Sequence, residues 1–254
     1  MLKSKRKILN INNKIELIFI FSIIATICLS YYWSSLKETI SFSDISISRT
    51  SILSESTYER FILNLKDTNK SFFKIINNSI ETHPYIKAAR VSKHFPNKIL
   101  IELIERKPIA FLKAKDFLIA TIDIDGFILP IQGNIRNFNL PVMSNINPDP
   151  KLYPNGKIVL SKKVKECISW LALINKKHIN LYNNISEINM TSLNEIEIIL
   201  YDHPTNIYLG QKNFISRIGT LIEFQKVLYP KQLSDFAYLD MRYKNQIIAK
   251  ERKS

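Results

Sequence analysis

Two alternating runs joined by a proline–asparagine turn constrain the fold of this chain more than any other feature. The runs cover residues 86–93 and 98–106, and the turn between them is Pro96-Asn97. Proline presets the backbone at the second position of a β-turn, and asparagine tolerates the third position. The apolar residues of the second run, which share one face of a strand, are Ile99, Ile101 and Leu103. The pattern predicts a β-hairpin with one buried face.

The residues before this hairpin predict one strand and two helices. Residues 40–48 alternate loosely and predict a strand. Ser56 and Glu59 have the spacing of a capping box and predict a helix start. The apolar faces of the two helices are formed by Tyr58, Phe61, Ile62 and Leu65, and by Phe72, Phe73, Ile76 and Ile80. His83 ends the second helix, because a residue before proline avoids the α conformation.

The end of the hairpin carries a motif that resembles a known family. After the Phe-Pro turn the chain runs into Glu-Arg-Lys-Pro, and the motif positions are Pro96, Glu105, Arg106 and Pro108. This ending resembles the POTRA domain of the FtsQ/DivIB cell-division proteins, which also has the order β-α-α-β-β. That family usually carries a glycine soon after the first strand, whereas this chain has Arg49-Thr50-Ser51 there. Because neighbouring strand residues face opposite ways, we expect Glu105 to find an ionic partner across the sheet rather than pair with Arg106.

An apolar segment over residues 15–33 predicts an N-terminal transmembrane helix. Its length matches the roughly 20 residues that a spanning helix needs, and its anchor residues are Leu17, Phe21, Ile24 and Trp33. Basic residues cluster before the segment, so the positive-inside rule places the N-terminus in the cytoplasm and the remaining chain outside it. A cleaved signal peptide is the alternative, and it is disfavoured because the run is long and no small-residue cleavage site follows.

Residues 109–250 predict a mixed β domain with flanking helices. Asp125-Gly126, between apolar runs, is a strong hairpin signal. The spacing of Asp123 and Gly126 resembles the Asp-x-x-Gly hairpin that opens the β domain of FtsQ, and residues 140–142 resemble the next landmark. Ser144-Asn145 stands where a glycine usually follows that landmark.

Further elements follow in this domain. Residues 144–157 predict a loop, and Ser161 predicts the cap of a helix whose apolar face contains Val164, Cys167, Ile168, Leu171 and Ile174. Strands are predicted near residues 185–191, 195–201 and 205–209. A last helix carries Phe214, Ile218, Leu221, Ile222 and Leu228.

A final strand over residues 236–249 holds the functional candidates. Its start, Tyr-Leu-Asp-Met-Arg-Tyr, resembles the Tyr-Val-Asp-Leu-Arg-Tyr landmark of FtsQ, where the strand lies at a sheet edge and accepts a strand of FtsB. An edge strand presents unpaired N–H and C=O groups, which suits that role. The resemblance implies partner binding by Tyr238, Leu239, Asp240, Met241, Arg242, Tyr243 and Gln246. The alternative is that these side chains belong to an ordinary strand.

Composition and motifs favour a binding protein over an enzyme. The net charge is +14, but no Arg-rich stripe or nucleic-acid motif accompanies it, so we expect no nucleic-acid partner. The four histidines lack metal-ligand spacing, and no nucleophile, phosphate-loop or dinucleotide motif occurs. Asp123 and Asp125 could begin a calcium loop, yet Phe127 and Leu129 fill later ligand positions. Cys28 and Cys167 cannot easily pair, so no disulfide framework is expected. We expect no cofactor, catalytic residue, metal or small-molecule substrate.

These predictions combine into one α+β architecture. It has a cytoplasmic tail (1–14), a transmembrane helix (15–33), a POTRA domain (40–108) and an FtsQ-type β domain (109–250). The resemblance implies a non-enzymatic scaffold of the inner membrane, with a periplasmic C-terminal domain, that recruits FtsB and FtsL at the division septum and links early to late division proteins. Two alternatives stay open. One is a POTRA module of envelope protein assembly or secretion, and the other is an anchored envelope enzyme, which would need a pocket of acids or histidines with perturbed pKa values.

Overall fold

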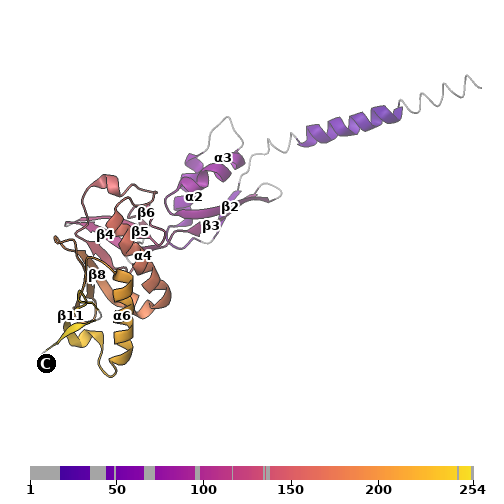
Figure 1. Ribbon diagram of the computed structural model, residues 1–254. Coiled ribbons are helices and arrows are strands. Elements are labelled where there is room, and N and C mark those ends of the chain that lie inside the picture. The colour runs from indigo at the N-terminus through magenta and orange to yellow at the C-terminus, as the bar shows by residue number, and fades with distance from the viewer. Residues whose placement is uncertain are drawn as a thin grey trace, which may run out of the picture.

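The computed structural model describes residues 18–34, 44–48, 50–65, 72–94, 98–115, 117–133, 135, 138–244 and 246–252. Residues 18–34 form a helix that lies apart from two sheets (Figure 1). Within these ranges, no helix is both long and apolar enough to cross a membrane. The predicted anchor residues Phe21, Ile24 and Trp33 are exposed on this helix, and Leu17 lies outside the described residues.

A three-stranded sheet with two helices forms the first folded part. Its elements are β1 (Asp44–Ser48), α2 (Glu55–Asn64), α3 (Phe72–Ser79), the 3-10 turn η1 (Ile80–Thr82), β2 (Ile86–His94) and β3 (Lys98–Glu105). The strand order is β1-β3-β2, with β1 parallel and β2 antiparallel to β3. The predicted order β-α-α-β-β is therefore confirmed. The predicted Pro96-Asn97 turn and residues 40–43 lie outside the described residues.

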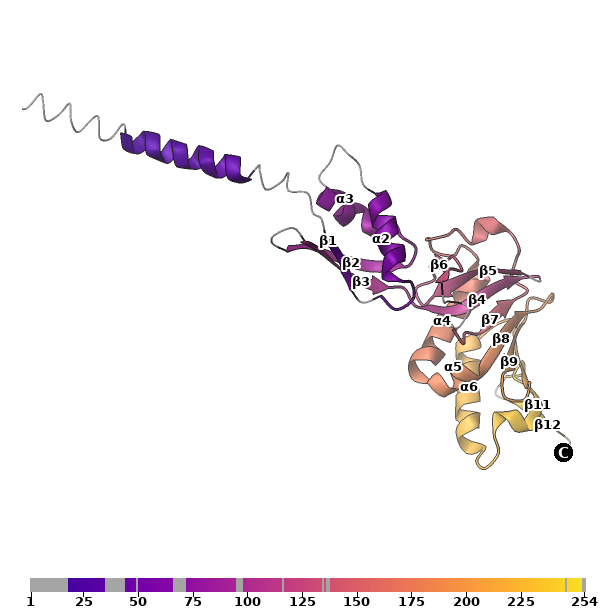
Figure 2. The same ribbon diagram turned by 180° about the vertical axis from the view of Figure 1, so that it is seen from behind.

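Buried and more exposed residues alternate along β3, so one face of this strand packs under the helices (Figure 2). The buried apolar residues that form this core include Tyr58, Ile62, Ile76, Ile80, Ile99, Ile101 and Leu103. The same core contains Phe111 and Leu129, which come from the second sheet. The two sheets therefore share one apolar cluster at their junction.

The start of α2 differs from the prediction. The helix begins at Glu55, and extended Ser54 is its N-cap residue. Ser56 lies inside the first turn, where the Ser54 hydroxyl bonds to its hydroxyl at 2.9 Å. The capping box predicted at Ser56 and Glu59 is wrong, because a capping box needs its serine in the extended residue before the helix.

A nine-stranded mixed sheet forms the second folded part. In spatial order its strands are β12 (Ile248–Glu251), β11 (Phe236–Asp240), β10 (Asn206–Gly210), β9 (Ile196–Leu200), β8 (Ile185–Met190), β7 (Val142–Ser144), β4 (Pro108–Ala114), β5 (Phe117–Asp123) and β6 (Ile128–Leu129). Its helices are α4 (Lys162–Lys177), α5 (Ile179–Asn184) and α6 (Phe214–Val227), with 3-10 turns η3 (Pro150–Leu152) and η4 (Leu233–Asp235). The three α-helices cover one face of the sheet (Figures 1 and 2).

The predicted hairpin after β5 is confirmed as a turn. The Asp123 carboxylate accepts the N–H groups of Asp125 at 2.9 Å and Phe127 at 2.8 Å. Gly126 has φ +83°, a left-handed conformation that glycine adopts without a side-chain clash. Because Asp123 is occupied by backbone amides, it organises the turn as an Asx motif does.

Other local predictions for this part are confirmed. The Ser161 hydroxyl accepts the Val164 N–H at 3.5 Å at the start of α4. Cys167 is buried on that helix, and burial raises the pKa of its thiol to about 12. Asn145 adopts φ +55°, a left-handed conformation that asparagine tolerates. Helix α5 was not predicted, because its six residues are too few for a clear apolar period.

The single final strand predicted over residues 236–249 is wrong. The chain leaves the sheet after Asp240, turns, and returns as β12 antiparallel to β11. Inside the turn the Arg242 N–H donates to the Asp240 carboxylate at 3.0 Å, which bends the backbone away from β10. Consequently β11 lies between β10 and β12, and β12 is the strand at this edge.

The Glu-Arg-Lys-Pro motif joins the two sheets. The Glu105 carboxylate accepts N–H groups from Ser51 at 2.5 Å, Ile52 at 3.0 Å and Leu53 at 3.3 Å, and the Tyr58 hydroxyl at 2.6 Å. The ionic partner expected for Glu105 is therefore wrong, since amides and a hydroxyl satisfy it. This carboxylate holds the loop after β1.

Arg106 and Pro108 extend this junction towards the second sheet. The Arg106 guanidinium lies 3.0 Å from the Asp123 carboxylate and 3.5 Å above the centre of the Phe127 ring. Buried Pro108 begins β4 opposite Asp123. We call Glu105, Arg106, Pro108 and Asp123 the domain joint.

Candidate partner-binding edge

Strand β12 presents an open edge at one end of the nine-stranded sheet. All four of its residues, Ile248–Glu251, are exposed. The Arg252 N–H donates to the Asp235 carbonyl at 2.9 Å, towards β11. Because N–H directions alternate along a strand, Ala249 and Glu251 point their N–H groups away from β11. The outer side of β12 can therefore accept another strand.

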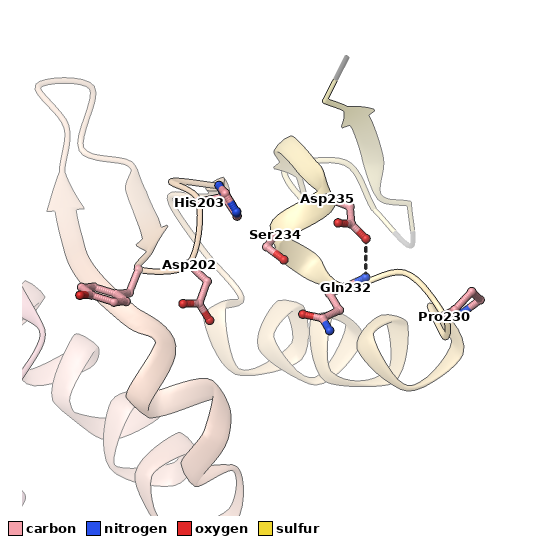
Figure 3. Close-up of a pocket in the computed structure, with 7 residues that line it drawn as sticks. Asp202, His203, Pro230, Gln232, Ser234 and Asp235 are labelled. Atoms are coloured by element: carbon pink, nitrogen blue, oxygen red, sulfur yellow. Dashed lines mark hydrogen bonds between the residues drawn. The ribbon is translucent and has the colours of Figure 1, made fainter. Parts of the chain in front are cut away.

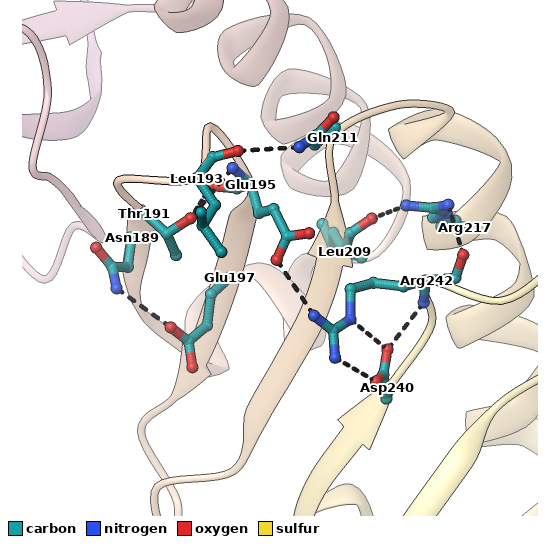
Figure 4. Close-up of polar contacts among 10 residues, drawn as sticks. All are labelled: Asn189, Thr191, Leu193, Glu195, Glu197, Leu209, Gln211, Arg217, Asp240 and Arg242. Carbon is teal, nitrogen blue, oxygen red and sulfur yellow. Dashed lines mark hydrogen bonds and ion pairs between the residues drawn. The ribbon is translucent and has the colours of Figure 1, made fainter.

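An ion-pair network fixes the turn that leads into β12 (Figure 4). The Arg242 guanidinium donates to both carboxylate oxygens of Asp240, at 2.9 and 2.7 Å, and to Glu195 at 3.3 Å. The hydrogen bonds from Arg242 hold the pKa of Asp240 below its usual range. The same contacts raise the pKa of Arg242, so both groups stay charged at neutral pH.

A second arginine ties this turn to α6 and β10. Arg217 donates to the carbonyl of Leu209 and, at 3.0 Å, to that of Arg242 (Figure 4). Gly210 lies beside both arginines at φ +74°, and a Cβ there would approach an Arg217 nitrogen to 2.7 Å. The left-handed backbone at this position favours glycine, and a side chain here would also push the end of the Arg217 side chain aside.

The seven predicted partner-binding residues differ in how far they are buried. Leu239 and Met241 are buried in the core, and Asp240 is buried in its ion pair. Tyr238 is half-buried, with its ring centroid 6.0 Å from that of Tyr208. The exposed members are Arg242, Tyr243 and Gln246. Most of the motif therefore supports the edge from within.

The sequence pattern assigned partner binding to residues 238–243 and Gln246, and it missed the residues of the outer strand. The residues that lie on the outer strand are Ile248, Ala249, Lys250 and Glu251. Polar residues 244–246 between two apolar runs are a turn signal that could have divided the final strand in two. Lys250 lies opposite Tyr238 in the register, and its ammonium is 5.9 Å from the centre of that ring.

An open cleft of about 820 Å³ lies near the β9–β10 turn (Figure 3). Its walls come from the β9–β10 turn and from the connection between α6 and β11, and they include Tyr201, Asp202, His203, Gln232, Ser234 and Asp235. Arg252 bridges the two walls by donating to the carbonyls of Pro204 at 2.7 Å and Ser234 at 3.1 Å. The end of β12 is thereby fixed to the cleft.

The cleft contains an aspartate, a histidine and a serine, residue types that hydrolases also use. The Asp235 carboxylate accepts the Gln232 N–H at 2.8 Å and so stabilises the turn (Figure 3). Among the described residues, no hydrogen bond joins His203 to the Ser234 hydroxyl, which nucleophile activation requires. Within the same ranges, no group of three or more His, Cys, Asp or Glu side chains could hold a metal ion.

Two family models match consecutive parts of this sequence. Residues 42–106 match the model described as POTRA domain, FtsQ-type. Residues 107–250 match the model described as FtsQ/DivIB, C-terminal related. The boundary between the matches falls inside the domain joint.

Curated relatives with similar sequences carry cell-division names. A cell division protein DivIB of Clostridium botulinum (strain Loch Maree / Type A3) is 27% identical over 252 residues, which cover 95% of this chain and 91% of the relative. A DivIB of Clostridium tetani is 27% identical over 190 residues, 71% of this chain and 66% of the relative. A cell division protein FtsQ of Haemophilus influenzae is 26% identical over 172 residues, 66% of this chain and 59% of the relative.

Proposed function

Because this chain belongs to the FtsQ/DivIB family of cell-division proteins, we propose that it is a non-enzymatic scaffold of the division machinery at the septum. Its proposed work is to recruit FtsB and FtsL and to link early to late division proteins. The observation that carries this proposal is the open edge of β12, with its exposed residues and the outward N–H groups of Ala249 and Glu251. A sheet edge of this kind binds an extended segment through backbone hydrogen bonds.

The proposal places the chain in the inner membrane with its C-terminal domain in the periplasm. It rests on the apolar segment over residues 15–33 and on the basic residues before it. A reporter that is active only outside the cytoplasm, fused after Ser254, should be active. If only a cytoplasmic reporter works at that position, the proposed topology is wrong.

In the proposed complex, a strand of FtsB adds to the outer side of β12. Backbone hydrogen bonds supply the affinity, and exposed side chains at the start of the edge, such as Tyr243 and Gln246, contribute specificity. Asp240 and Arg242 act indirectly, because their ion pair fixes the turn that leads into β12. Leu239 and Met241 support the edge from the core.

Co-purification of the full-length protein with FtsB and FtsL from membranes tests this proposal. Ala249→Pro removes an outward N–H group without removing a bond to β11, because proline has no backbone donor. Ala249→Val is the matched control, since it changes the same exposed side chain and keeps the N–H group. We expect the proline variant to lose the partners and the valine variant to retain them.

Folding of each variant is checked by circular dichroism and thermal melting. If a folded Ala249→Pro protein still recovers FtsB and FtsL at the wild-type level, the partner site does not lie on β12. Equal loss in both variants would show that the side chain of residue 249 matters rather than its N–H group.

A further inference from the structure

A buried histidine lies beside the domain joint. His83 follows η1, and its imidazole ring packs against two aromatic rings of α2. The ring centroids are 5.1 Å apart for Tyr58 and 4.8 Å apart for Phe61, and both pairs meet edge to face. Because the Tyr58 hydroxyl also donates to Glu105, the histidine shares a neighbour with the joint.

The histidine ring holds the backbone of Tyr85. Its Nδ1 accepts the Tyr85 N–H at 3.3 Å, so the ring is neutral and carries its proton on Nε2. Burial lowers the pKa of His83, and attraction by the Glu105 carboxylate opposes this effect without overcoming it. The contact with Tyr85 is therefore complete at neutral pH.

Tyr85 in turn connects the two sheets. Its hydroxyl donates to the carbonyl of Pro130, which directly follows β6 of the nine-stranded sheet. The neighbouring Pro84 packs against Gly156 of the second folded part, where an added Cβ would lie 3.5 Å from the proline ring. Residues 83–85 therefore contact the second folded part twice, and the imidazole fixes the backbone between these contacts and α2.

A proton on Nδ1 would remove this arrangement. The ring would then carry two N–H groups and a positive charge, and the N–H of Tyr85 would face a donor instead of an acceptor. A buried donor without a partner costs more than the hydrogen bond that it loses. The protonated ring is therefore favoured only when residues 83–85 move away and let water reach it.

The groups around the ring do not supply enough compensation. Among the described residues, the titratable groups that face it are Tyr58 of α2, Tyr85 and Glu105 of β3. Burial raises the pKa of both tyrosines, so their hydroxyls are neutral. The Glu105 carboxylate is charged, but it already accepts hydrogen bonds from Ser51, the loop after β1 and Tyr58.

We propose that His83 is a pH-sensitive contact between the two folded parts, and that its protonation in mild acid releases residues 83–85 and loosens one sheet from the other. A released histidine binds a proton near its ordinary pKa of about 6.5, whereas the packed ring resists it. The packed state therefore loses stability as the pH falls below about 6.5, before Glu105 is protonated. Pro130 lies at the end of the sheet opposite β12, so this contact is separate from the proposed partner edge.

The distance between two spin labels on the full-length protein tests the proposal. One label is attached at Glu59→Cys, exposed on α2, and the other at Lys165→Cys, exposed on α4. Cys28 is changed to serine, and Cys167 is buried and stays unlabelled. We expect a narrow distance distribution at about pH 7.5 that broadens at about pH 5.5 and narrows again when the pH is restored.

Three variants separate the histidine from other groups. His83→Gln can accept the Tyr85 N–H with its amide oxygen but takes up no proton, so its distribution should stay the same at both pH values. His94→Gln is the matched control, because His94 is exposed on β2, and this variant should broaden as the wild type does. Tyr85→Phe removes the bond to Pro130, so its distribution should be broader already at about pH 7.5.

A wild-type distribution of equal width at both pH values would overturn the proposal, as would equal broadening in a folded His83→Gln protein. If His83→Gln does not fold, NMR titration of the histidine ring carbons in the wild type decides. The midpoint of the broadening should coincide with the titration of the His83 ring. Broadening that begins only near pH 4, where carboxylates take up protons, would assign the effect to those groups and overturn the proposal.

Discussion

The domain joint and the β12 edge were both identified from short motifs, yet the structure uses them in opposite ways. At the joint, the side chains of Glu105 and Arg106 point inward and bond to neighbouring elements. At the edge, the groups that we propose to bind a partner are backbone amides of residues outside the motif, and the side chains of Asp240 and Arg242 hold the turn that presents them. A motif can therefore mark a site by fixing its geometry without forming its surface.

The difference implies different responses to mutation. A side chain at the joint is satisfied by several buried partners, so its removal leaves several polar groups without hydrogen bonds. A side chain near the edge is partly solvated and can be replaced by water at lower cost. Stability should therefore depend on the joint, and partner binding on the edge.

Ile101→Asp should have the largest effect on stability. It places a charge without a partner in the core under α2 and α3, at a cost of about 4 kcal/mol or more. Because Phe111 and Leu129 belong to the same core, the loss should spread into β4 and β6. Hydrogen exchange should show faster exchange at Phe111 and Leu129 as well as in β3. Faster exchange confined to the three-stranded sheet would show that the shared apolar cluster does not couple the sheets.

Glu105→Gln tests the joint directly. The carboxylate receives five hydrogen bonds, from Ser51 (two), Ile52, Leu53 and Tyr58. An uncharged amide accepts them more weakly and adds a donor, so the free energy of unfolding should fall by about 2–3 kcal/mol. Chemical denaturation measures the loss. Glu223→Gln on exposed α6 is the matched control, and an equal loss there would contradict a special role for Glu105.

The same carboxylate predicts a loss of stability in acid. Burial alone would raise the pKa of Glu105, but hydrogen bonds from Tyr58 and Ser51 outweigh it and leave the pKa below its ordinary value. A lowered pKa in the folded state stabilises the protein above the unfolded pKa of about 4.3, and this contribution is lost as the pH falls towards the folded pKa. Melting temperatures between pH 6 and 3 should fall less steeply in Glu105→Gln than in the wild type. Parallel curves would contradict the assignment.

Sequence patterns predicted the elements well and their mutual arrangement poorly. Alternation in β3, the Asp-Gly turn and the Ser161 cap depend on residues close in the sequence, so local chemistry was sufficient. The backbone partners of Glu105 lie 52 to 54 residues away in the loop after β1, and Tyr58 lies 47 residues away in α2, so no local signal points to them. The division of the final strand depends on Arg242 folding back onto Asp240, which strand propensity does not encode.

Arg242→Ala should have a moderate effect, because it removes the partner of a buried carboxylate at the edge. Asp240 would keep the backbone N–H of residue 242 but lose both side-chain bonds, so stability should fall by about 1–2 kcal/mol. The pKa of Asp240 should rise towards its ordinary value, since the hydrogen bonds from Arg242 are the main cause that lowers it. NMR titration of the Asp240 carboxyl carbon measures this shift. Glu195→Gln is the control, because its bond to Arg242 is longer and should leave the Asp240 pKa low.

Tyr238→Ala should have the smallest effect on partner binding. It tests whether this motif residue contacts the partner directly. Tyr238 lies on β11, so a strand added to β12 would be two strand spacings away, roughly 9–10 Å. Its ring can influence that strand only through Lys250, whose ammonium lies 5.9 Å from the ring centre. We therefore expect binding of FtsB and FtsL to weaken by less than about 1 kcal/mol, below the loss typical of an interface anchor. Titration with the purified partner pair measures it, with Ala249→Pro as the variant that loses binding. A loss above about 2 kcal/mol in a folded Tyr238→Ala protein would show that the partner contacts the open face of the sheet as well as its edge.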